Sequence, residues 1–388
     1  MRVELTTITF ALLLAAAPPA AQAQQIPSGW GNFTASLDAY VRADDIVGAS
    51  AAFVRGGRIV ARHHVGAADA AGNRAVDDST IFHWGSITKT VGAAAIMQLR
   101  DRGRLTLDDA AVRWVPELRQ VHDPFGAIDS ITVRMLLSHS AGFQSPTWPW
   151  TDGADWEPFE PTRWDQLVAM MPYMRLRFRP GSGYGYSNPA YVYLARIVEA
   201  ASGDPWQSYV QKNIFTPLGL TRSYFGATPY HLAGHRSHGY YVRVDSTGAD
   251  SLVDVGADFD PGITIPNGGW NAPVSDVATW MSALMGTADF ALLPRQTAEE
   301  MWNPVVEAEL DPGSGATERM GLGLFIVEAD GKRFVGHTGT QAGYRSWMRF
   351  DPAAGTGYVV VVNTSTQGRR GPAPELAKML QAAHRLLR

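Results

Sequence analysis

Hydrophobic side chains come in short runs near the start of the chain, in the pattern expected of paired strands. The stretch VGASAAFVRGGRIVARHHVG (residues 47–66) carries two such runs, one on each side of Gly56 and Gly57. Two successive glycines permit the positive φ angles of a tight hairpin turn. The pattern predicts two antiparallel strands joined at this dipeptide.

A helical period follows in SITKTVGAAAIMQLRDRGRL, which begins at Ser86. Apolar side chains recur there at the spacing of a helix face. The pattern stops at Gly103, a residue type that commonly follows the last turn of a helix. We expect a mostly buried helix of about five turns. Its apolar positions are Val91, Ala94, Ala95, Met97 and Leu99.

The middle of the chain, at about residues 105–315, mixes helical segments with loops rich in Pro, Gly and Trp, and no strand alternation dominates it. Strand-like runs return in roughly the last 80 residues, with a turn at Asp330-Gly331 and another at residues 352–357, before a helical tail. We therefore predict an α/β fold, in which an antiparallel sheet built from N- and C-terminal strands is flanked by helices and carries an inserted, mostly helical lobe.

The first residues, MRVELTTITFALLLAAAPPAAQAQQ, have a charged start, an apolar run of about ten residues and a small-x-small site ending at Ala23. We expect a signal peptide over residues 1–23, with a retained anchor as the alternative. The run is shorter than the roughly 20 apolar residues that span a bilayer, so no stable anchor is expected after cleavage. The predicted location is the periplasm or the medium. The chain has no cysteine, so disulfides give no independent support.

The mature part, residues 24–388, is predicted to be one two-lobed domain, with the sheet lobe at about 24–90 and 316–388 and the helical lobe at about 91–315. Composition agrees with a globular protein, because 45% of the 388 residues are apolar and 18% are charged. The formal net charge of -4 supplies no basic field for a polyanion. We expect no nucleic-acid partner and no cofactor.

Candidate chemistry begins with FHWGSITKT (residues 82–90), where Ser86 stands three residues before Lys89. On a helix, such a pair shares one face, and a lysine whose pKa is lowered by burial could activate the serine hydroxyl. Lys89 is the only one of the four lysines with a serine at that spacing. The alternative is a serine that merely caps the helix.

Two later stretches favour the catalytic interpretation. In GSGYGYSNPAY (residues 181–191), Tyr186 and Asn188 precede or begin a predicted helix, where a phenol and an amide could face one cavity. In FVGHTGTQAGY (residues 334–344), His337 opens a His-Thr-Gly sequence at the end of a predicted strand, and a glycine there lets a ligand lie along the strand edge. Their alternatives are a packed tyrosine in a loop and a β-turn.

In this order and spacing, SITK, YSN and HTG resemble the motifs of the penicillin-recognising serine hydrolases. The chain is most similar to the branch with class C β-lactamases, D-alanyl-D-alanine carboxypeptidases and related family VIII-type serine esterases, and LLSHSAGF (residues 136–143) looks like a connecting segment of that family. The resemblance covers nearly all of the mature chain and implies a β-lactamase/transpeptidase-like fold. It also implies an acyl-enzyme acting on amide or ester bonds of a small-molecule or peptide substrate.

The resemblance assigns roles to single residues. It implies that Ser86 is the acylated nucleophile, that Lys89 is its proton partner and that Tyr186 shuttles protons to the leaving group and from water. Asn188 would contact the substrate amide and orient Lys89. The oxyanion hole would combine the backbone N–H groups of Ser86 and Thr340. The remaining substrate contacts would come from His337, Thr338, Gly339 and, as a weaker match, Gln144.

One departure concerns charge. Many β-lactamases have lysine where this chain has His337, and a histidine titrates near pH 6.5. We therefore expect only a partial positive charge at neutral pH for a substrate carboxylate, which argues against efficient β-lactam turnover. A carboxylesterase of the same fold, and a non-catalytic penicillin-binding protein, are the alternatives to a β-lactamase or carboxypeptidase. No Gly-x-Ser-x-Gly motif indicates an α/β-hydrolase.

Two further stretches leave alternatives open. HLAGHRSH gives His231, His235 and His238 a spacing that could hold zinc, but no acidic ligand stands near, so loop packing or hydrogen bonding is favoured over a metal site. The Trp-rich loop at residues 143–164 could form a lid over an apolar substrate group or could simply pack. Its tryptophans are Trp148, Trp150, Trp156 and Trp164.

Overall fold

Strands from both ends of the chain form one nine-stranded sheet in the computed structural model, which describes residues 25–143, 161–244, 250–258, 260–308, 317–329, 331–367 and 374–387. The order across this sheet is β3-β2-β1-β14-β13-β12-β11-β10-β9. The two chain ends meet where β1 pairs antiparallel with β14. The strands are β1 (Gly48–Arg55), β2 (Arg58–Asp69), β3 (Arg74–Ala75), β9 (Val306–Ala308), β10 (Thr317–Met320), β11 (Phe325–Ala329), β12 (Lys332–Gln341), β13 (Tyr344–Asp351) and β14 (Thr356–Val362).

The predicted hairpin at residues 47–66 is confirmed. β1 and β2 are antiparallel, and the two residues between them, Gly56 and Gly57, have φ angles of 54° and 78°. Positive φ at both positions is the turn geometry whose twist matches that of the flanking strands. The predicted antiparallel C-terminal meander is also present as β11 to β14.

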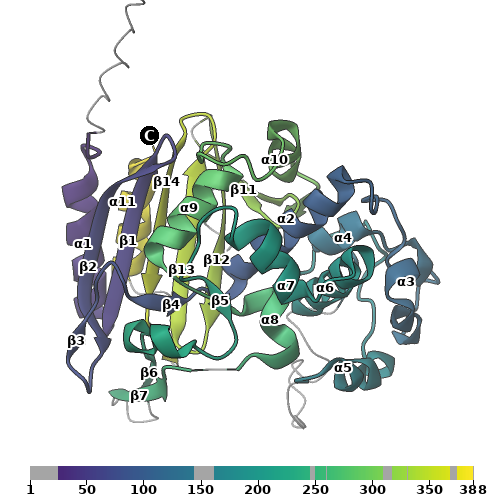
Figure 1. Cartoon of the computed structure of the whole chain (residues 1–388), viewed down its shortest axis with the longest axis horizontal. Helices are drawn as coiled ribbons and strands as arrows, with labels where there is room; N and C mark the ends of the chain where they lie inside the picture. The colour runs from purple at the N-terminus through teal and green to yellow at the C-terminus, as the bar shows by residue number, and fades with distance from the viewer. Residues whose placement is uncertain are drawn as a thin grey trace, which may run out of the picture.

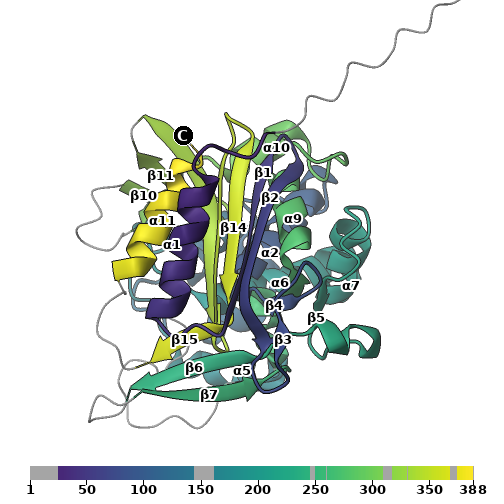
Figure 2. The same cartoon turned by 90° about the vertical axis from the view of Figure 1, so that its left-hand side faces the viewer.

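Helices cover both faces of the sheet (Figures 1 and 2), and the strands are apolar for that reason. On β1, Ala51 and Phe53 lie in the cluster formed with α1 (Trp30–Ala43) and α11 (Pro374–Arg385). Their neighbours on the strand, Ala52 and Val54, lie in the larger core on the other face. Because successive side chains point to opposite faces, a strand covered on both sides reads as one continuous apolar run.

The larger core joins the second face of the sheet to the helical part of the molecule. Helix α9 (Val274–Leu284) lies against the sheet. In Figure 1, α2 (Thr88–Asp101) lies between α9 and α6 (Asn188–Ser202). Every residue of α2 from Thr88 to Leu99 is buried, as the sequence predicted for most of this helix. The shorter helices are α3 (Ala111–Trp114), α4 (Val133–Leu137), α5 (Trp164–Met170), α7 (Trp206–Val210), α8 (Ile265–Gly268) and α10 (Arg295–Met301).

The observed architecture confirms the predicted fold class, but the middle of the chain contains more strand than its pattern indicated. A second sheet has the order β15-β6-β7, and a third has the order β4-β8-β5. The β7 strand was missed because most of its side chains are exposed, so no apolar alternation marks it. The bounds are β4 (Ile81–His83), β5 (Tyr224–Phe225), β6 (Gly239–Val244), β7 (Asp250–Gly256), β8 (Trp270–Pro273) and β15 (Thr364–Gln367).

Two elements lie within the residue range expected for the helical lobe but belong with the sheet. β9 is an edge strand of the sheet, and α9 packs on the sheet. The expected signal peptide at residues 1–23 lies outside the described residues, so it stays a prediction. None of the helices in the described ranges combines the length and the apolar character needed to cross a membrane.

Candidate active site

Ser86 lies in the turn that connects β4 to α2. This 3₁₀ turn spans Gly85–Ile87, and α2 begins directly after it at Thr88. Within residues 81–90, Ser86 is the one side chain that is partly exposed. Neither the turn nor the helix has a side-chain hydrogen bond at its N-cap, so the structure does not support the alternative that Ser86 is a simple capping residue.

Lys89 is completely buried and contacts Ser86 directly. Ser86 lies in the 3₁₀ turn and Lys89 lies three residues later in the first turn of α2, so the two side chains share one face, and the Lys89 Nζ atom lies 2.9 Å from Ser86 Oγ. Lys89 also donates a 2.6 Å hydrogen bond to the carbonyl oxygen of Asn267, a residue that the sequence did not single out. Burial lowers the pKa of Lys89 well below 10.5. A neutral amine beside the hydroxyl could accept its proton.

Tyr186 reaches the same point from the segment that leads into α6. Ser187 caps this helix by accepting a hydrogen bond from the Ala190 N–H. The Tyr186 ring centroid lies 5.0 Å from Lys89 Nζ. Burial raises the pKa of the Tyr186 phenol, while a hydrogen bond with Ser86 opposes that shift. The structure thus brings together the three side chains that the sequence predicted as catalytic.

The free edge of β12 lies beside Ser86. β12 pairs with β11 only as far as Gly336, whereas its pairing with β13 continues to Gln341. The β12–β13 turn has positive φ at Ala342 and Gly343 and is closed by Gln341 and Tyr344. Since backbone groups alternate in direction along an antiparallel strand and the closing pair bonds across the turn, the Thr340 N–H points away from β13.

Two glycines let β12 approach the Ser86 turn closely. A Cβ atom on Gly85 would lie 2.9 Å from the Thr340 nitrogen, and one on Gly339 would lie 2.1 Å from the Trp84 carbonyl oxygen. The backbones are therefore too close for a side chain at either position. This approach places the backbone N–H groups of Ser86 and Thr340 on neighbouring segments, as an oxyanion hole requires. The Thr338 and Thr340 side chains are exposed on the same strand.

His337 requires a correction, because it is not a partly charged group at neutral pH. Its side chain is 1% exposed, and its ring packs 5.0 Å from the Phe325 ring. Burial is the main cause that lowers the pKa of His337 to about 3, and the neighbouring Lys89 also disfavours a positive charge on this ring. Its Nδ1 donates a 2.6 Å hydrogen bond to the Thr338 carbonyl oxygen. A neutral, enclosed imidazole supplies no charge for a substrate carboxylate.

Of the predicted substrate contacts Asn188 and Gln144, the structure describes only Asn188. Asn188 begins α6, and its buried Oδ1 atom has no hydrogen-bond partner, so this atom does not orient Lys89. The amide oxygen stays available to a substrate donor. Gln144 lies outside the described residues, as do Trp148, Trp150 and Trp156. Trp164, at the start of α5, packs under the Arg196 guanidinium at 4.9 Å.

His139 is a site residue to which the sequence gave no role. It lies in LLSHSAGF, is 1% exposed, and its ring centroid is 4.4 Å from that of Tyr186. Burial is the main cause that lowers its pKa well below 6.5, and the neighbouring Lys89 and His337 also disfavour a positive charge on this ring. Only the quoted family segment marked this position in advance.

Three buried histidines make stability depend on pH. Burial lowers the pKa of His83 to about 4, that of His337 to about 3 and that of His139 well below 6.5. Below pH 6.5 the unfolded chain binds protons that the folded chain does not, so stability is lost as pH falls. At about 1.4 kcal/mol per pH unit for each proton, these histidines contribute up to about 4 kcal/mol per pH unit between pH 6 and 5. Asp276 offsets up to about 1.4 kcal/mol per pH unit of this, because burial raises its pKa to about 6 and the folded chain takes up that proton first.

Urea unfolding at several pH values measures this slope. His337→Asn keeps a donor for the Thr338 carbonyl and removes one titrating group, so we expect the slope to fall by up to about 1.4 kcal/mol per pH unit, the contribution of one histidine. His231→Gln, at an exposed position, is the control and should leave the slope unchanged. An identical slope in all three proteins would contradict the assignment.

The histidines at residues 231–238 do not converge. His235 Nδ1 lies 2.8 Å from Ser79 Oγ, and His238 Nδ1 lies 2.9 Å from an Asp254 oxygen. Within the described ranges, no group of three or more His, Asp or Glu side chains is arranged to hold a metal ion. The favoured interpretation, hydrogen bonding to neighbouring segments, agrees with these contacts.

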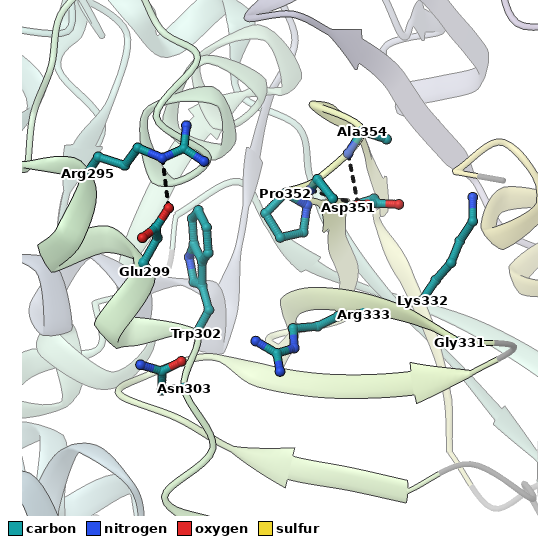
Figure 3. Close-up of a pocket in the computed structure, with 11 residues that line it drawn as sticks. Arg295, Glu299, Trp302, Asn303, Gly331, Lys332, Arg333, Asp351, Pro352 and Ala354 are labelled. Carbon is teal, nitrogen blue, oxygen red and sulfur yellow. Dashed lines mark hydrogen bonds and ion pairs between the residues drawn. The ribbon is translucent and has the colours of Figure 1, made fainter.

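A cavity of about 680 Å³ lies apart from the Ser86 cluster, between α10 and the β13–β14 turn (Figure 3). Its charged groups are already partnered: Arg295 pairs with Glu299 at 2.7 Å, and Asp351 accepts the N–H groups of Ala353 and Ala354. None of the motif residues lines it. It is not the candidate active site.

Comparison with known proteins agrees with this geometry. The family model described as Beta-lactamase matches residues 33–383. Esterase EstB from Burkholderia gladioli is 30% identical over 87% of this chain and 91% of the esterase. Penicillin-binding protein 4* from Bacillus subtilis (strain 168) is 28% identical over 76% of this chain and 63% of that protein.

Among solved structures, the octameric penicillin-binding protein homologue from Pyrococcus abyssi is 28% identical with a TM-score of 0.75, covering 92% of this chain and 77% of that chain. These matches span both the sheet and the helical part, and they confirm the resemblance found in the motifs. The chain belongs to the Beta-lactamase family.

Proposed function

We propose that the protein is a serine hydrolase that forms an acyl-enzyme at Ser86 and acts preferentially on uncharged carboxylic esters. The observation that carries this proposal is the 2.9 Å contact between Ser86 Oγ and the buried Lys89 Nζ. Burial favours the neutral amine, which is the form able to take a proton from the serine hydroxyl. Periplasmic or extracellular location, suggested by the first 23 residues, is part of the same proposal.

Acylation uses the groups around Ser86 in turn. Ser86 Oγ attacks the ester carbonyl carbon as its proton passes to Lys89 Nζ. The carbonyl oxygen becomes an oxyanion that accepts hydrogen bonds from the backbone N–H groups of Ser86 and Thr340. The tetrahedral species then breaks the bond to the alcohol oxygen, which takes a proton from the Tyr186 phenol. Lys89 then passes the proton that it took from Ser86 to the Tyr186 phenolate, so both groups are neutral again.

Tyr186 acts as a relay because its phenolate is costly. Burial raises its pKa, so a separated phenolate is disfavoured, and proton loss to the alcohol must be coupled to proton gain from Lys89. Deacylation reverses the relay. Water attacks the acyl carbon, its proton passes through Tyr186 and Lys89, and Ser86 Oγ leaves as a hydroxyl with release of the acid.

The preference for uncharged esters follows from His337. This imidazole is neutral at physiological pH, and the Asn188 amide contributes hydrogen bonding without charge. The relative EstB carries the name of an esterase. The second candidate is an amide substrate such as a β-lactam or a D-alanyl peptide, and the free edge of β12 favours it because a strand edge can pair with a peptide backbone.

A substrate panel tests the proposal. We expect short p-nitrophenyl esters to be hydrolysed with a burst of nitrophenol, and an acyl adduct to map to Ser86. Nitrocefin and a D-alanyl-D-alanine peptide should turn over at least about tenfold more slowly. Each carries a carboxylate, and the neutral His337 gives that carboxylate no opposite charge, which in a partly hydrated site costs about one charge interaction. Faster turnover of nitrocefin or of the peptide would reverse the assigned preference.

Ser86→Ala is the matched variant. It should abolish both the burst and the adduct while leaving thermal unfolding nearly unchanged, because a small residue replaces a small one in a partly exposed position. An adduct on any other residue would overturn the role of Ser86. Permanent labelling by a fluorescent penicillin without ester turnover would instead identify a penicillin-binding protein.

A further inference from the structure

His139 holds the residues on both sides of Tyr186. The Gly185 N–H donates a 2.9 Å hydrogen bond to the His139 carbonyl oxygen, and the Ser187 N–H donates a 3.1 Å hydrogen bond to His139 Nδ1. Tyr186 is thus fixed by one neighbour bound to the backbone of His139 and by the other bound to its ring. The ring itself packs 4.4 Å from the Tyr186 ring.

The backbone of His139 is in an uncommon conformation. Its φ angle is 56°, in the left-handed region that residues other than Gly, Asn and Asp rarely adopt. Such a residue persists only where its surroundings determine it, and it often lies at a functional site. Here the conformation follows the last turn of α4, and it directs the carbonyl oxygen and the ring of one residue to the same loop.

The hydrogen bond from Ser187 also fixes the protonation state of His139. Nδ1 accepts, so it carries no proton, and the single proton of the neutral ring is on Nε2. The ring is enclosed by three tyrosines, Tyr184, Tyr186 and Tyr191, at centroid distances of 6.1, 4.4 and 5.2 Å. Protonation would destroy the acceptor and would add a charge beside Lys89 and His337.

We propose that His139 is the positioning residue for Tyr186, holding the Gly185–Ser187 segment in place through its carbonyl oxygen and its unprotonated Nδ1. This inference rests on the proposed function, in which Tyr186 relays protons between Lys89 and the leaving group. A misplacement of the phenol by about 1 Å can cost about 100-fold in rate without altering substrate binding. The effect of losing His139 therefore falls on kcat.

Two substitutions separate the acceptor from the backbone conformation. His139→Gly and His139→Asn both tolerate the positive φ angle, and both remove the imidazole ring. Toward the Ser187 N–H they differ in one respect: the Asn amide oxygen can replace Nδ1 as the acceptor, whereas Gly has no side chain to accept the hydrogen bond. Any loss of stability that comes from the missing ring is common to both variants.

Ester kinetics on the folded fraction give the first test. We expect His139→Gly to lower kcat by about 10- to 100-fold with KM changed by less than about threefold, and His139→Asn to recover kcat to within about fivefold of the wild type. Equal losses in the two variants, or wild-type kcat in His139→Gly, would overturn the positioning role.

Nitrogen-15 NMR of the histidine rings gives a second test that needs no turnover. The His139 resonances are identified as those that are missing from the spectrum of His139→Asn. In the wild type, these resonances should show a proton on Nε2, no proton on Nδ1, and no titration between pH 8 and pH 5. A proton on Nδ1, or titration in that range, would overturn the proposed hydrogen bond. If the wild type hydrolyses no ester but this signature is present, the proposed function fails while the hold on Tyr186 stands.

Discussion

Replacing Lys89 with methionine is expected to lower the kcat for ester hydrolysis by about 1,000-fold, the middle of the range for losing a positioned acid or base. Methionine fills similar volume and needs no hydrogen bond. Burial disfavours a charge at Lys89, so an apolar side chain removes an unfavourable contribution, but it also leaves the Asn267 carbonyl oxygen without its 2.6 Å hydrogen bond. These two effects oppose each other, so the unfolding temperature should change little. Steady-state kinetics and thermal unfolding of the same preparation measure both effects.

The pair Lys89 and Tyr186 is expected to act as one unit. Tyr186→Phe removes the phenol hydroxyl but keeps the ring that packs on His139, and it should cost about 100-fold or more in kcat. Because the proton passes through both groups, the double variant should be little slower than the slower single variant. If the logarithmic losses of the two single variants simply add, the two residues act independently and the relay is wrong.

Much of the site could be predicted from the sequence because its parts are local in the chain. The contact between Ser86 and Lys89 depends on a spacing of three residues within one turn, and the predicted hairpin depends on two adjacent glycines. The three motif segments each gave a side chain that the structure brings to one place. Local spacing carries this information regardless of how the rest of the chain folds.

The environment of these residues could not be predicted, because distant segments supply it. The carbonyl oxygen that accepts the hydrogen bond from Lys89 belongs to Asn267, 178 positions later in the chain. The low pKa of His337 results from enclosure by Phe325 and from the nearby Lys89 amine, and no local pattern around His337 indicates burial. The expected partial charge was therefore wrong even though the position of His337 beside the site was as predicted.

The close approach of β12 to the Ser86 turn leads to the second large effect, for Gly339→Ala. A Cβ there would lie 2.1 Å from the Trp84 carbonyl oxygen. That oxygen accepts a 3.0 Å hydrogen bond from the Ser346 hydroxyl of β13, so it is held on the sheet side. The strand and the turn must separate, and the N–H groups of Ser86 and Thr340 with them. Losing one oxyanion donor costs about 100- to 1,000-fold in kcat, and we expect a loss of that size.

Gly336→Ala is the matched control on the same strand. Its Cβ would lie 1.9 Å from the Met348 carbonyl oxygen of β13, so it produces a similar clash directed away from Ser86. Both variants should unfold at lower temperature, but only Gly339→Ala should lose most of its kcat per folded molecule, with the folded fraction measured by circular dichroism. If Gly339→Ala does not fold, Gly85→Ala opens the same gap from the turn, since its Cβ would lie 2.9 Å from the Thr340 nitrogen. Equal kcat losses at Gly336 and Gly339 would show that the close approach maintains the sheet and does not build the oxyanion hole.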